Sequence, residues 1–202
     1  MNEFNNSKPS SVKIPSIAIF ASGAGSNAER IIDFFRLKEN IAHVTLIVCN
    51  KTNAGVLSIA KKNLIETIII EKELFFNSDT YIIALKERNI DFIVLAGFLW
   101  KVPLSLIKAY PDKIINIHPA LLPKYGGKGM YGNKVHEAVI SAAEKQSGIT
   151  IHYVDEFYDH GKIILQATCE IDTVDNAESL AAKIHLLEHQ HYPLAIEKIL
   201  SK

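Results

Sequence analysis

The sequence predicts an α/β protein with a doubly wound, mostly parallel sheet and helices on both faces. From residue 16 to residue 117, short β-branched runs alternate with longer amphipathic ones, a pattern typical of parallel strands joined by helical crossovers. The strand-like runs are apolar throughout, as expected when helices cover both faces of a sheet. After residue 146, two strand-like runs lie only six residues apart, which predicts an antiparallel excursion in the C-terminal third.

The predicted strands begin with SIAIFA at 16–21, an apolar segment with the length of a buried strand. Further runs share this apolar, β-branched composition: 43–49, 66–70, 91–95, 113–117, 148–155 and 162–171. Ligands of open parallel sheets bind beyond the carboxyl ends of the strands. Functional motifs should therefore directly follow the predicted strands.

The predicted helices lie between these strands and after the last one. The first helix, 26–38, places Ile31, Ile32, Phe34 and Phe35 on its inner side. The others are about 54–63, 79–89, a short helix from Pro103, and a long helix from Asp175 to about 199. The string from Asp175 to Glu178 fits an acidic form of the capping box, and Pro193 is expected to bend the last helix.

Composition excludes several classes of protein. Of the 202 residues, 48% are hydrophobic and 22% charged, which fits one globular domain, 15–202, behind a polar leader, 1–14, that we expect to be disordered. Twenty-two basic residues balance 22 acidic ones, which argues against nucleic acid as a partner. No apolar run reaches the roughly 20 residues of a membrane helix. Cys49 and Cys169 have neither disulfide nor zinc spacing, and the leader lacks the apolar core of a signal peptide, so we expect a cytoplasmic protein.

A glycine-containing loop, Ser22 to Asn27, follows the first predicted strand and opens the first helix. Glycines let a ligand approach the backbone, and a helix start offers free N–H groups to an anion. The loop also matches the loose dinucleotide pattern, but an acid is then expected after the second strand. Asn50 stands there, which weakens the NAD hypothesis and leaves a phosphate-bearing ligand.

Asn116 and His118 end the fifth predicted strand. Alternation along a strand puts both side chains on one face, where an amide donor and an imidazole suit oxyanion stabilisation and proton transfer. Asp159 lies in the turn EFYDHG, where an aspartate is by itself ordinary turn chemistry. The glycine-rich segment 126–132 is either a surface loop or a mobile flap that excludes water beside His118.

A histidine cluster in the last helix contains His185, Glu188, His189 and His191. Histidines four residues apart suggest a metal site. A helical wheel, however, puts Leu180, Ile184, Leu187 and His191 inward, turns His185 and His189 towards solvent, and leaves Glu188 at the border, where it could reach a ligand. No third ligand is apparent, so we predict no metal.

Together these motifs resemble the phosphoribosylglycinamide formyltransferases, folate-dependent enzymes of purine synthesis, over about residues 15–200. The resemblance rests on SGAGSN at 22–27, VLAGFL at 94–99, NIHPALLPKY at 116–125 and EFYDHG at 156–161. It implies a Rossmann-like formyltransferase fold, with 15–202 as the catalytic domain. It also implies 10-formyltetrahydrofolate as formyl donor, phosphoribosylglycinamide (GAR) as acceptor, and no metal.

The resemblance also implies a role for each matching residue. The catalytic residues are Asn116, His118 and Asp159. The phosphate and GAR are bound by Gly25, Ser26, Asn27 and Glu188. The folate pocket is lined by Leu95, Leu99, Trp100, Lys101, Val102, Asn116, Asp155, Glu156, Phe157, Tyr158 and Asp159. The chain departs from the family pattern at Trp100, where a basic residue is common, near Ser78, where some members have an arginine, and at His160, which replaces a glycine.

Three other functions stay open. A formyltetrahydrofolate hydrolase would use the same three residues on water. An NAD-dependent oxidoreductase is weakened by Asn50, and a ligand-binding protein without catalysis would have no use for Asn116, His118 and Asp159. The oligomeric state stays open as well, with a homodimer among the options.

Overall fold

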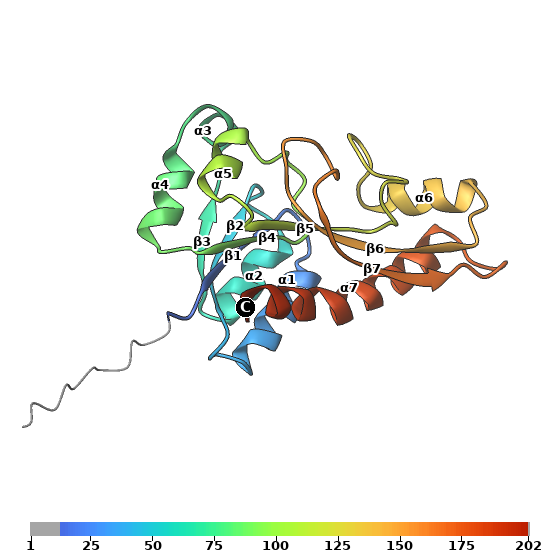
Figure 1. Cartoon of the computed structure of the whole chain (residues 1–202), viewed down its shortest axis with the longest axis horizontal. Helices are drawn as coiled ribbons and strands as arrows, with labels where there is room; N and C mark the ends of the chain where they lie inside the picture. Colours follow the sequence, from blue (N-terminus) through green and yellow to red (C-terminus); the bar gives the residue numbers. More distant parts are fainter. Residues whose placement is uncertain (1–12, 202) are drawn as a thin grey trace, which may run out of the picture.

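The computed structural model describes residues 13–201, which fold around one seven-stranded sheet (Figure 1). The strand order is β3-β2-β1-β4-β5-β6-β7. The strands are β1 Ser16–Ala21, β2 His43–Cys49, β3 Glu66–Ile69, β4 Phe92–Leu95, β5 Ile114–His118, β6 Gln146–Tyr153 and β7 Ile163–Glu170. The first five strands are parallel, whereas β6 and β7 run antiparallel to their neighbours. The predicted fold class, including the antiparallel excursion, is confirmed.

Helices cover both faces of the sheet (Figure 1). They are α1 Ser26–Arg36, α2 Gly55–Lys62, α3 Lys72–Asn77, α4 Thr80–Glu87, α5 Leu104–Ala109, α6 Asn133–Ser141 and α7 Ala177–Leu200. Alternate residues of β1 serve two cores. Ile17 and Ile19 pack with residues of α1, α2 and α7, whereas Ala18 and Phe20 pack with residues of α3, α4 and α5. This alternation explains why the whole strand is apolar.

Two helices, α3 and α6, were not predicted. α3 has only six residues, too few for a helical period to stand out from the sequence, and it lacks the proline that marks the start of the equally short α5. α6 directly follows Gly132, where the glycine-rich segment predicts only a loop or flap. The buried side chains of Phe75 in α3 and Val135 in α6 show that packing on the rest of the fold supports both helices.

The N-terminal cap of the long helix α7 lies one residue later than predicted. Asn176, not Asp175, is the capping residue: its side chain accepts the backbone N–H groups of Glu178 and Ser179, and the Ser179 hydroxyl accepts from the Asn176 N–H. The predicted box with Asp175 and Glu178 is therefore wrong. Asp175 instead accepts from Lys183 and from the Ser179 hydroxyl.

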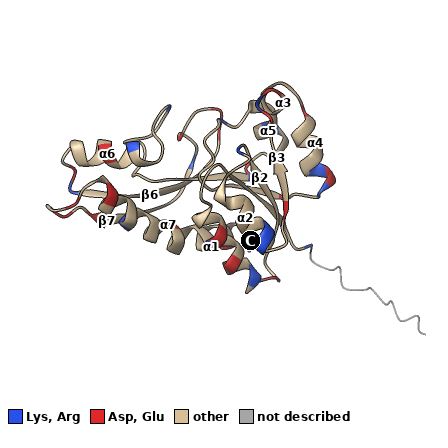
Figure 2. Ribbon diagram, turned by 180° about the vertical axis from the view of Figure 1, so that it is seen from behind, with Lys and Arg blue, Asp and Glu red and all other residues tan. Residues whose placement is uncertain are grey.

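Most of the predicted leader, residues 1–12, lies outside the described residues. Lys13 forms an ion pair with Asp91, which also accepts the Ser16 N–H at 3.0 Å, so the chain entering β1 is held beside the start of β4. Positions of Lys and Arg and positions of Asp and Glu are interspersed along the ribbon, in helices as well as loops (Figure 2). Within residues 13–201, no helix has the length and apolar character needed to cross a membrane.

Tyr192 attaches α7 to the sheet. Its ring is fully buried, and its hydroxyl donates to the Leu95 carbonyl at 2.9 Å and lies 3.4 Å from the Ile115 carbonyl. The Leu95 carbonyl belongs to the last residue of β4, and the Ile115 carbonyl belongs to the adjacent parallel strand β5. The functional side chains of α7 are thereby held beside the sheet edge where ligands of this fold class bind.

Candidate active site

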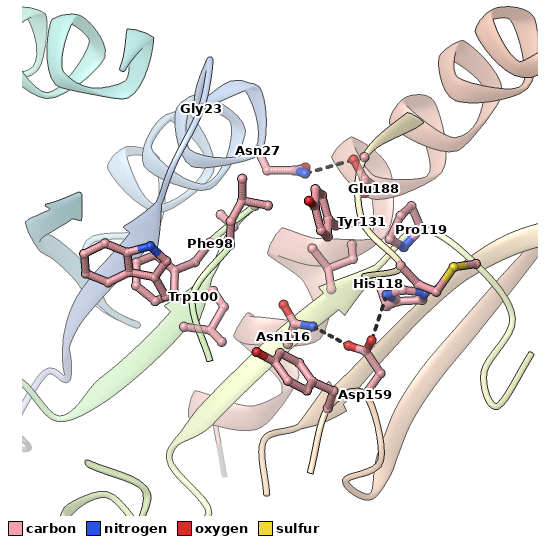
Figure 3. A pocket seen from close by; sticks show the side chains of 18 of the residues that line it. Gly23, Asn27, Phe98, Trp100, Asn116, His118, Pro119, Tyr131, Asp159 and Glu188 are labelled. Atoms are coloured by element: carbon pink, nitrogen blue, oxygen red, sulfur yellow. Dashed lines mark hydrogen bonds and ion pairs between the residues drawn. The ribbon is translucent and has the colours of Figure 1, made fainter. Parts of the chain in front are cut away.

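A cavity of about 500 Å³ opens beyond the carboxyl ends of β1, β4 and β5. The loops after these strands line it, together with α7, the glycine-rich segment before α6 and the loop between β6 and β7 (Figure 3). Its position is the one expected for ligands of open parallel sheets. Of the predicted site residues, all but Glu156 line it. Glu156 is exposed, and the turn that holds it is formed by Asp155 accepting the Phe157 N–H at 2.9 Å.

The glycine loop forms one end of the cavity. Gly25 precedes the first turn of α1 with a φ of 88°, a left-handed conformation that favours glycine. A Cβ at this position would lie 2.8 Å from the Val56 Cβ and 2.9 Å from the Val56 Cα, so α1 and α2 also leave no room for a side chain. Ser26 and Asn27 follow and line the cavity at the free N-terminus of α1, where an anion is favoured.

Asn27, Glu188 and His185 form a polar cluster at this end. The Asn27 amide donates to Glu188 Oε2 at 2.9 Å, and His185 Nδ1 lies 2.8 Å from the same oxygen. The Glu188 hydrogen bond raises the pKa of His185, and burial only partly opposes this effect. The cluster therefore combines a buried carboxylate with an imidazole that gains its proton readily.

This cluster corrects the helical wheel for Glu188. Glu188 is only 5% exposed and belongs to the inward row Leu180, Ile184, Glu188 and Tyr192, rather than to its border. Glu188 points inward because Tyr192, fully buried under β4 and β5, sets the rotation of α7, and residues four positions apart lie on the same face. His185 is exposed, as the wheel predicts, with 56% of its side chain accessible, and it also lines the open cavity.

Asn116, His118 and Asp159 converge in the centre of the cavity (Figure 3). The Asn116 Nδ2 is 3.5 Å from Asp159 Oδ1, and His118 Nδ1 is 3.5 Å from Asp159 Oδ2. The Gly127 N–H donates to Asp159 Oδ2 at 2.9 Å, so the glycine-rich segment holds the carboxylate in place. Asp159 itself has a φ of 52°, one of the few positions where a non-glycine residue adopts the left-handed region.

The hydrogen bonds of His118 set the orientation of its ring. Nε2 lies 2.8 Å from the Tyr125 carbonyl, which can only accept, so Nε2 carries a proton and Nδ1 faces the carboxylate. When Nδ1 is also protonated, the two side chains form an ion pair. Because the His118 and Asp159 side chains are only 4% and 12% exposed, water screens this attraction weakly.

The other end of the cavity is apolar and aromatic. Leu95 and Val102 are buried there, whereas Leu99 is 44% exposed. The Trp100 indole packs on Phe75 and Phe76 of α3, with ring centroids 5.8 and 5.9 Å away. The unpredicted helix α3 therefore supports this wall.

Lys101 is the one Lys or Arg among the described residues that line the cavity. Its Nζ lies 5.6 Å from the centroid of the Tyr158 ring, within the range of a cation–π contact. His160, which like Trp100 departs from the family pattern, is exposed and pairs with Asp155 at 2.7 Å. Each of these contacts reaches the loop between β6 and β7.

Some lining residues were not predicted, chiefly His152 and His136, whereas Met130 and Tyr131 belong to the glycine-rich segment proposed as a flap. His152 lies opposite Asn116 in the antiparallel pairing of β5 with β6, a register that local sequence patterns do not specify. His136 lies on the unpredicted helix α6 and is buried. Burial lowers the pKa of His136, an effect to which His185 and His118 add and which Glu188 partly opposes.

Within residues 13–201, no three His, Cys, Asp or Glu side chains are arranged to hold a metal ion. In the histidine cluster of α7, the His185 and His189 rings are stacked with centroids 6.2 Å apart. His185 is hydrogen-bonded to Glu188, so this imidazole already has a partner within the helix.

A family profile for formyl transferases matches residues 15–196. The chain belongs to the formyl transferase family. Among its relatives, a chloroplastic phosphoribosylglycinamide formyltransferase of Vigna unguiculata is 39% identical, over 93% of this chain and 62% of the relative. The phosphoribosylglycinamide formyltransferase of Bacillus subtilis (strain 168) is 40% identical over 91% of this chain and 93% of the relative. The chain thus spans less than two thirds of the plant relative but nearly all of the bacterial one.

Solved structures of the formyl transferase family share the fold. A phosphoribosylglycinamide formyltransferase from Bacillus halodurans is 38% identical, with a TM-score of 0.83 over 93% of this chain and 96% of that one. Another, from Anaplasma phagocytophilum, is 33% identical, with a TM-score of 0.85 over 94% of this chain and 88% of that one. The sequence resemblance to this family is therefore confirmed by independent comparisons of sequence and structure.

Proposed function

We propose that this chain transfers the formyl group of 10-formyltetrahydrofolate to the amine of GAR in de novo purine biosynthesis. The products are formyl-GAR and tetrahydrofolate. The observation that carries the proposal is the convergence of Asn116, His118 and Asp159 between a helix N-terminus and an apolar wall in one cavity. Relatives matching nearly the whole chain bear the name of this activity, which further supports it.

The polar end of the cavity suits GAR. Its phosphate would accept N–H groups at the start of α1, around Gly25, Ser26 and Asn27, because the helix dipole favours an anion there. Asn27 and His185 both contact Oε2 of Glu188. The other oxygen, Oε1, is left to accept from the amine or hydroxyl groups of the glycinamide ribonucleotide.

The apolar end suits the formyl folate. Leu95, Leu99 and Val102 offer a surface for the flat pterin, and the loop from Asp155 to Asp159 closes on it. Lys101 and Trp100 lie at the side of this wall, where the benzoyl-glutamate part of the folate would extend. Because Lys101 is the one Lys or Arg in the described lining, we propose that the glutamate carboxylates are bound weakly.

The proposed reaction is direct attack of the GAR amine on the formyl carbon. A C–N bond forms and the carbonyl electron pair moves to oxygen, giving a tetrahedral oxyanion that Asn116 stabilises through its Nδ2. The His118 imidazolium faces the same charge. Asp159 faces His118 at 3.5 Å, orients its ring, and helps to take the proton from the attacking nitrogen. Protonation of N10 by His118 then breaks the bond between that nitrogen and the formyl carbon.

We place the reaction in the cytoplasm, with small molecules as substrates and no metal. Cys49 and Cys169 are both free, as is usual where thiols are kept reduced. The relatives' printed names do not all agree on location, since the plant enzymes are chloroplastic. Fractionation of cells carrying the tagged chain would test this placement.

A formyl-transfer assay tests the activity. The chain is mixed with 10-formyltetrahydrofolate, with and without GAR, and release of tetrahydrofolate is followed. Release only with GAR is expected. Release without GAR would indicate the hydrolase instead, and no release in either mixture would overturn the proposal in favour of a binding protein. His118→Asn serves as the control, because it should abolish most of any release that depends on this cavity.

A further inference from the structure

A buried histidine, His152, lies directly behind Asn116. The two residues are paired across β5 and β6, and His152 Nε2 is 3.1 Å from Asn116 Nδ2. His152 is only 2% exposed, and it contributes to the cavity wall. The mechanism proposed above gives it no proton to transfer.

The hydrogen bonds of His152 set which ring nitrogen carries the proton. Nδ1 lies 2.8 Å from the Tyr153 carbonyl. Because a carbonyl only accepts, Nδ1 donates to it. In the neutral ring Nε2 is then unprotonated, and its lone pair accepts a hydrogen bond from the Asn116 amide.

The surroundings keep this ring neutral. Burial lowers the pKa of His152. The hydrogen bond to Tyr153 and the carboxylates of Asp159 and Asp155 oppose this effect only partly, and His118 adds to it. Nε2 therefore remains an acceptor rather than becoming a second donor.

This acceptor determines the orientation of the Asn116 amide. In the orientation observed, Nδ2 faces both His152 Nε2 and, at 3.5 Å, Asp159 Oδ1. The opposite orientation would turn the amide oxygen towards a lone pair and a carboxylate, so two attractions would become two repulsions. One amide hydrogen is held by His152, while the second makes only a long approach to Asp159 and stays available to the reacting oxygen.

We propose that His152 is a positioning residue that holds the Asn116 amide with its second hydrogen aimed at the oxyanion. The inference rests on the proposed formyl transfer and deepens it. His152 acts through Asn116 rather than on the substrate, so its removal should lower kcat and leave both KM values nearly unchanged.

Two substitutions separate the contacts of His152. His152→Gln keeps a polar group at the Nε2 position, with an oxygen that can accept from Asn116. His152→Asn places its side-chain amide at the Nδ1 position, where the amide can donate to the Tyr153 carbonyl. This variant leaves Asn116 without its acceptor. We expect kcat to fall about 10- to 100-fold in His152→Asn, less than the 10²–10³ typical of losing an oxyanion donor itself. His152→Gln should stay within a few-fold of the wild type.

A double-mutant cycle with Asn116→Ala decides whether the effect passes through Asn116. In that background, His152→Asn should cause no further loss of kcat, because residues acting as one unit are non-additive. Full additivity, or equal losses in His152→Asn and His152→Gln, would overturn the proposal. Should His152→Asn fail to fold, as judged by its melting temperature, the cycle is run with His152→Gln, which must then show little effect in either background.

The pH profile separates positioning from proton transfer. The kcat profile of His152→Gln should keep every limb of the wild-type profile, and loss of one limb would mean that His152 itself moves a proton. Failure of the proposed function is distinguishable, because it would already appear as wild-type protein that releases no tetrahydrofolate in the presence of GAR.

Discussion

Asp159 is the residue on which the polar centre of the cavity depends. Its two oxygens lie near Asn116 and His118, and one of them also accepts the Gly127 N–H. Asp159→Asn keeps the size of the side chain but removes its charge. We expect kcat to fall about 10²- to 10⁴-fold, the usual range for a lost acid–base group, with the melting temperature nearly unchanged.

Steady-state kinetics across pH check this expectation. The matched control is Asp33→Asn, an aspartate that is half exposed on α1 and lies outside the cavity lining. Wild-type kcat in Asp159→Asn would show that the carboxylate takes no part in the reaction. The same conclusion would follow if His118→Asn, Asp159→Asn and the wild type all had the same pH profile of kcat.

Gly25 is the residue at which backbone conformation and packing both exclude a side chain. Gly25→Ala must keep a φ of 88° and bring a Cβ within 2.9 Å of the Val56 backbone. Overpacking typically costs about 1–3 kcal/mol, and the left-handed conformation adds roughly 1–2 kcal/mol. We therefore expect a loss of about 2–5 kcal/mol in the free energy of unfolding.

Urea titration of Gly25→Ala and Gly23→Ala gives the comparison. Gly23 lies in the same loop, but a Cβ there meets nothing within 4 Å. A small change in Gly23→Ala and a large one in Gly25→Ala are expected. Equal changes in both would mean that the general entropy of glycine, not this conformation, controls the stability of the loop.

At the scale of elements, the start of α7 depends on charged side chains. Lys183 pairs with Asp175 and Asp172, and hydrogen bonding to Lys183 holds the pKa of Asp175 down at about 2. A carboxylate with a depressed pKa in the folded state contributes stability above its unfolded value, near 3.9. That contribution is lost as the pH falls through the folded value.

The stability of Lys183→Met should consequently fall less steeply than that of the wild type between about pH 4 and pH 2. Thermal unfolding at a series of pH values measures the difference. Lys198→Met, a substitution in the last turn of the same helix, is the control and should follow the wild-type curve. Parallel curves for Lys183→Met and the wild type would contradict the role given to the Asp175 pair.

Elements with long or strongly apolar patterns were predictable, as was the short helix α5, which follows Pro103, whereas α3 and α6 were not. The strands 16–21 and 43–49 were predicted to the residue, because runs such as SIAIFA are apolar for their whole length. α3 was missed since six residues hold too little periodicity, although Phe75 and Phe76 support the wall beside Trp100. The cap of α7 was misplaced by one residue because Asp175 and Asn176 are both good capping residues.

At the scale of the whole molecule, the cavity joins segments from β1 to α7, so a ligand in it should stabilise the entire fold. A folate analogue at 100 times its Kd is expected to raise the free energy of unfolding by about 2.7 kcal/mol. Each kcal/mol corresponds to roughly 2–4 °C in melting temperature for a chain of this size. Thermal unfolding with and without the analogue measures the shift.

NAD is the matched comparison for that experiment. It should leave the melting temperature unchanged, because the loop after β2 offers Asn50 rather than a carboxylate to a ribose. A shift with NAD and none with the folate analogue would favour the oxidoreductase hypothesis over formyl transfer. The Trp100→Ala variant should show a smaller folate shift, since it removes part of the aromatic wall.

The amino-acid sequence by itself determined the fold class, the order of the strands along the chain and the main polar residues of the cavity. These features are local: alternation of short apolar runs with longer amphipathic ones, glycines at one turn, and Asn116 and His118 at the end of one strand. Tertiary structure alone decided the pairing of β5 with β6, which puts His152 behind Asn116, and the rotation of α7, which buries Glu188 beside Asn27. Strand register and helix rotation depend on packing between segments far apart in the chain, so no local pattern specifies them.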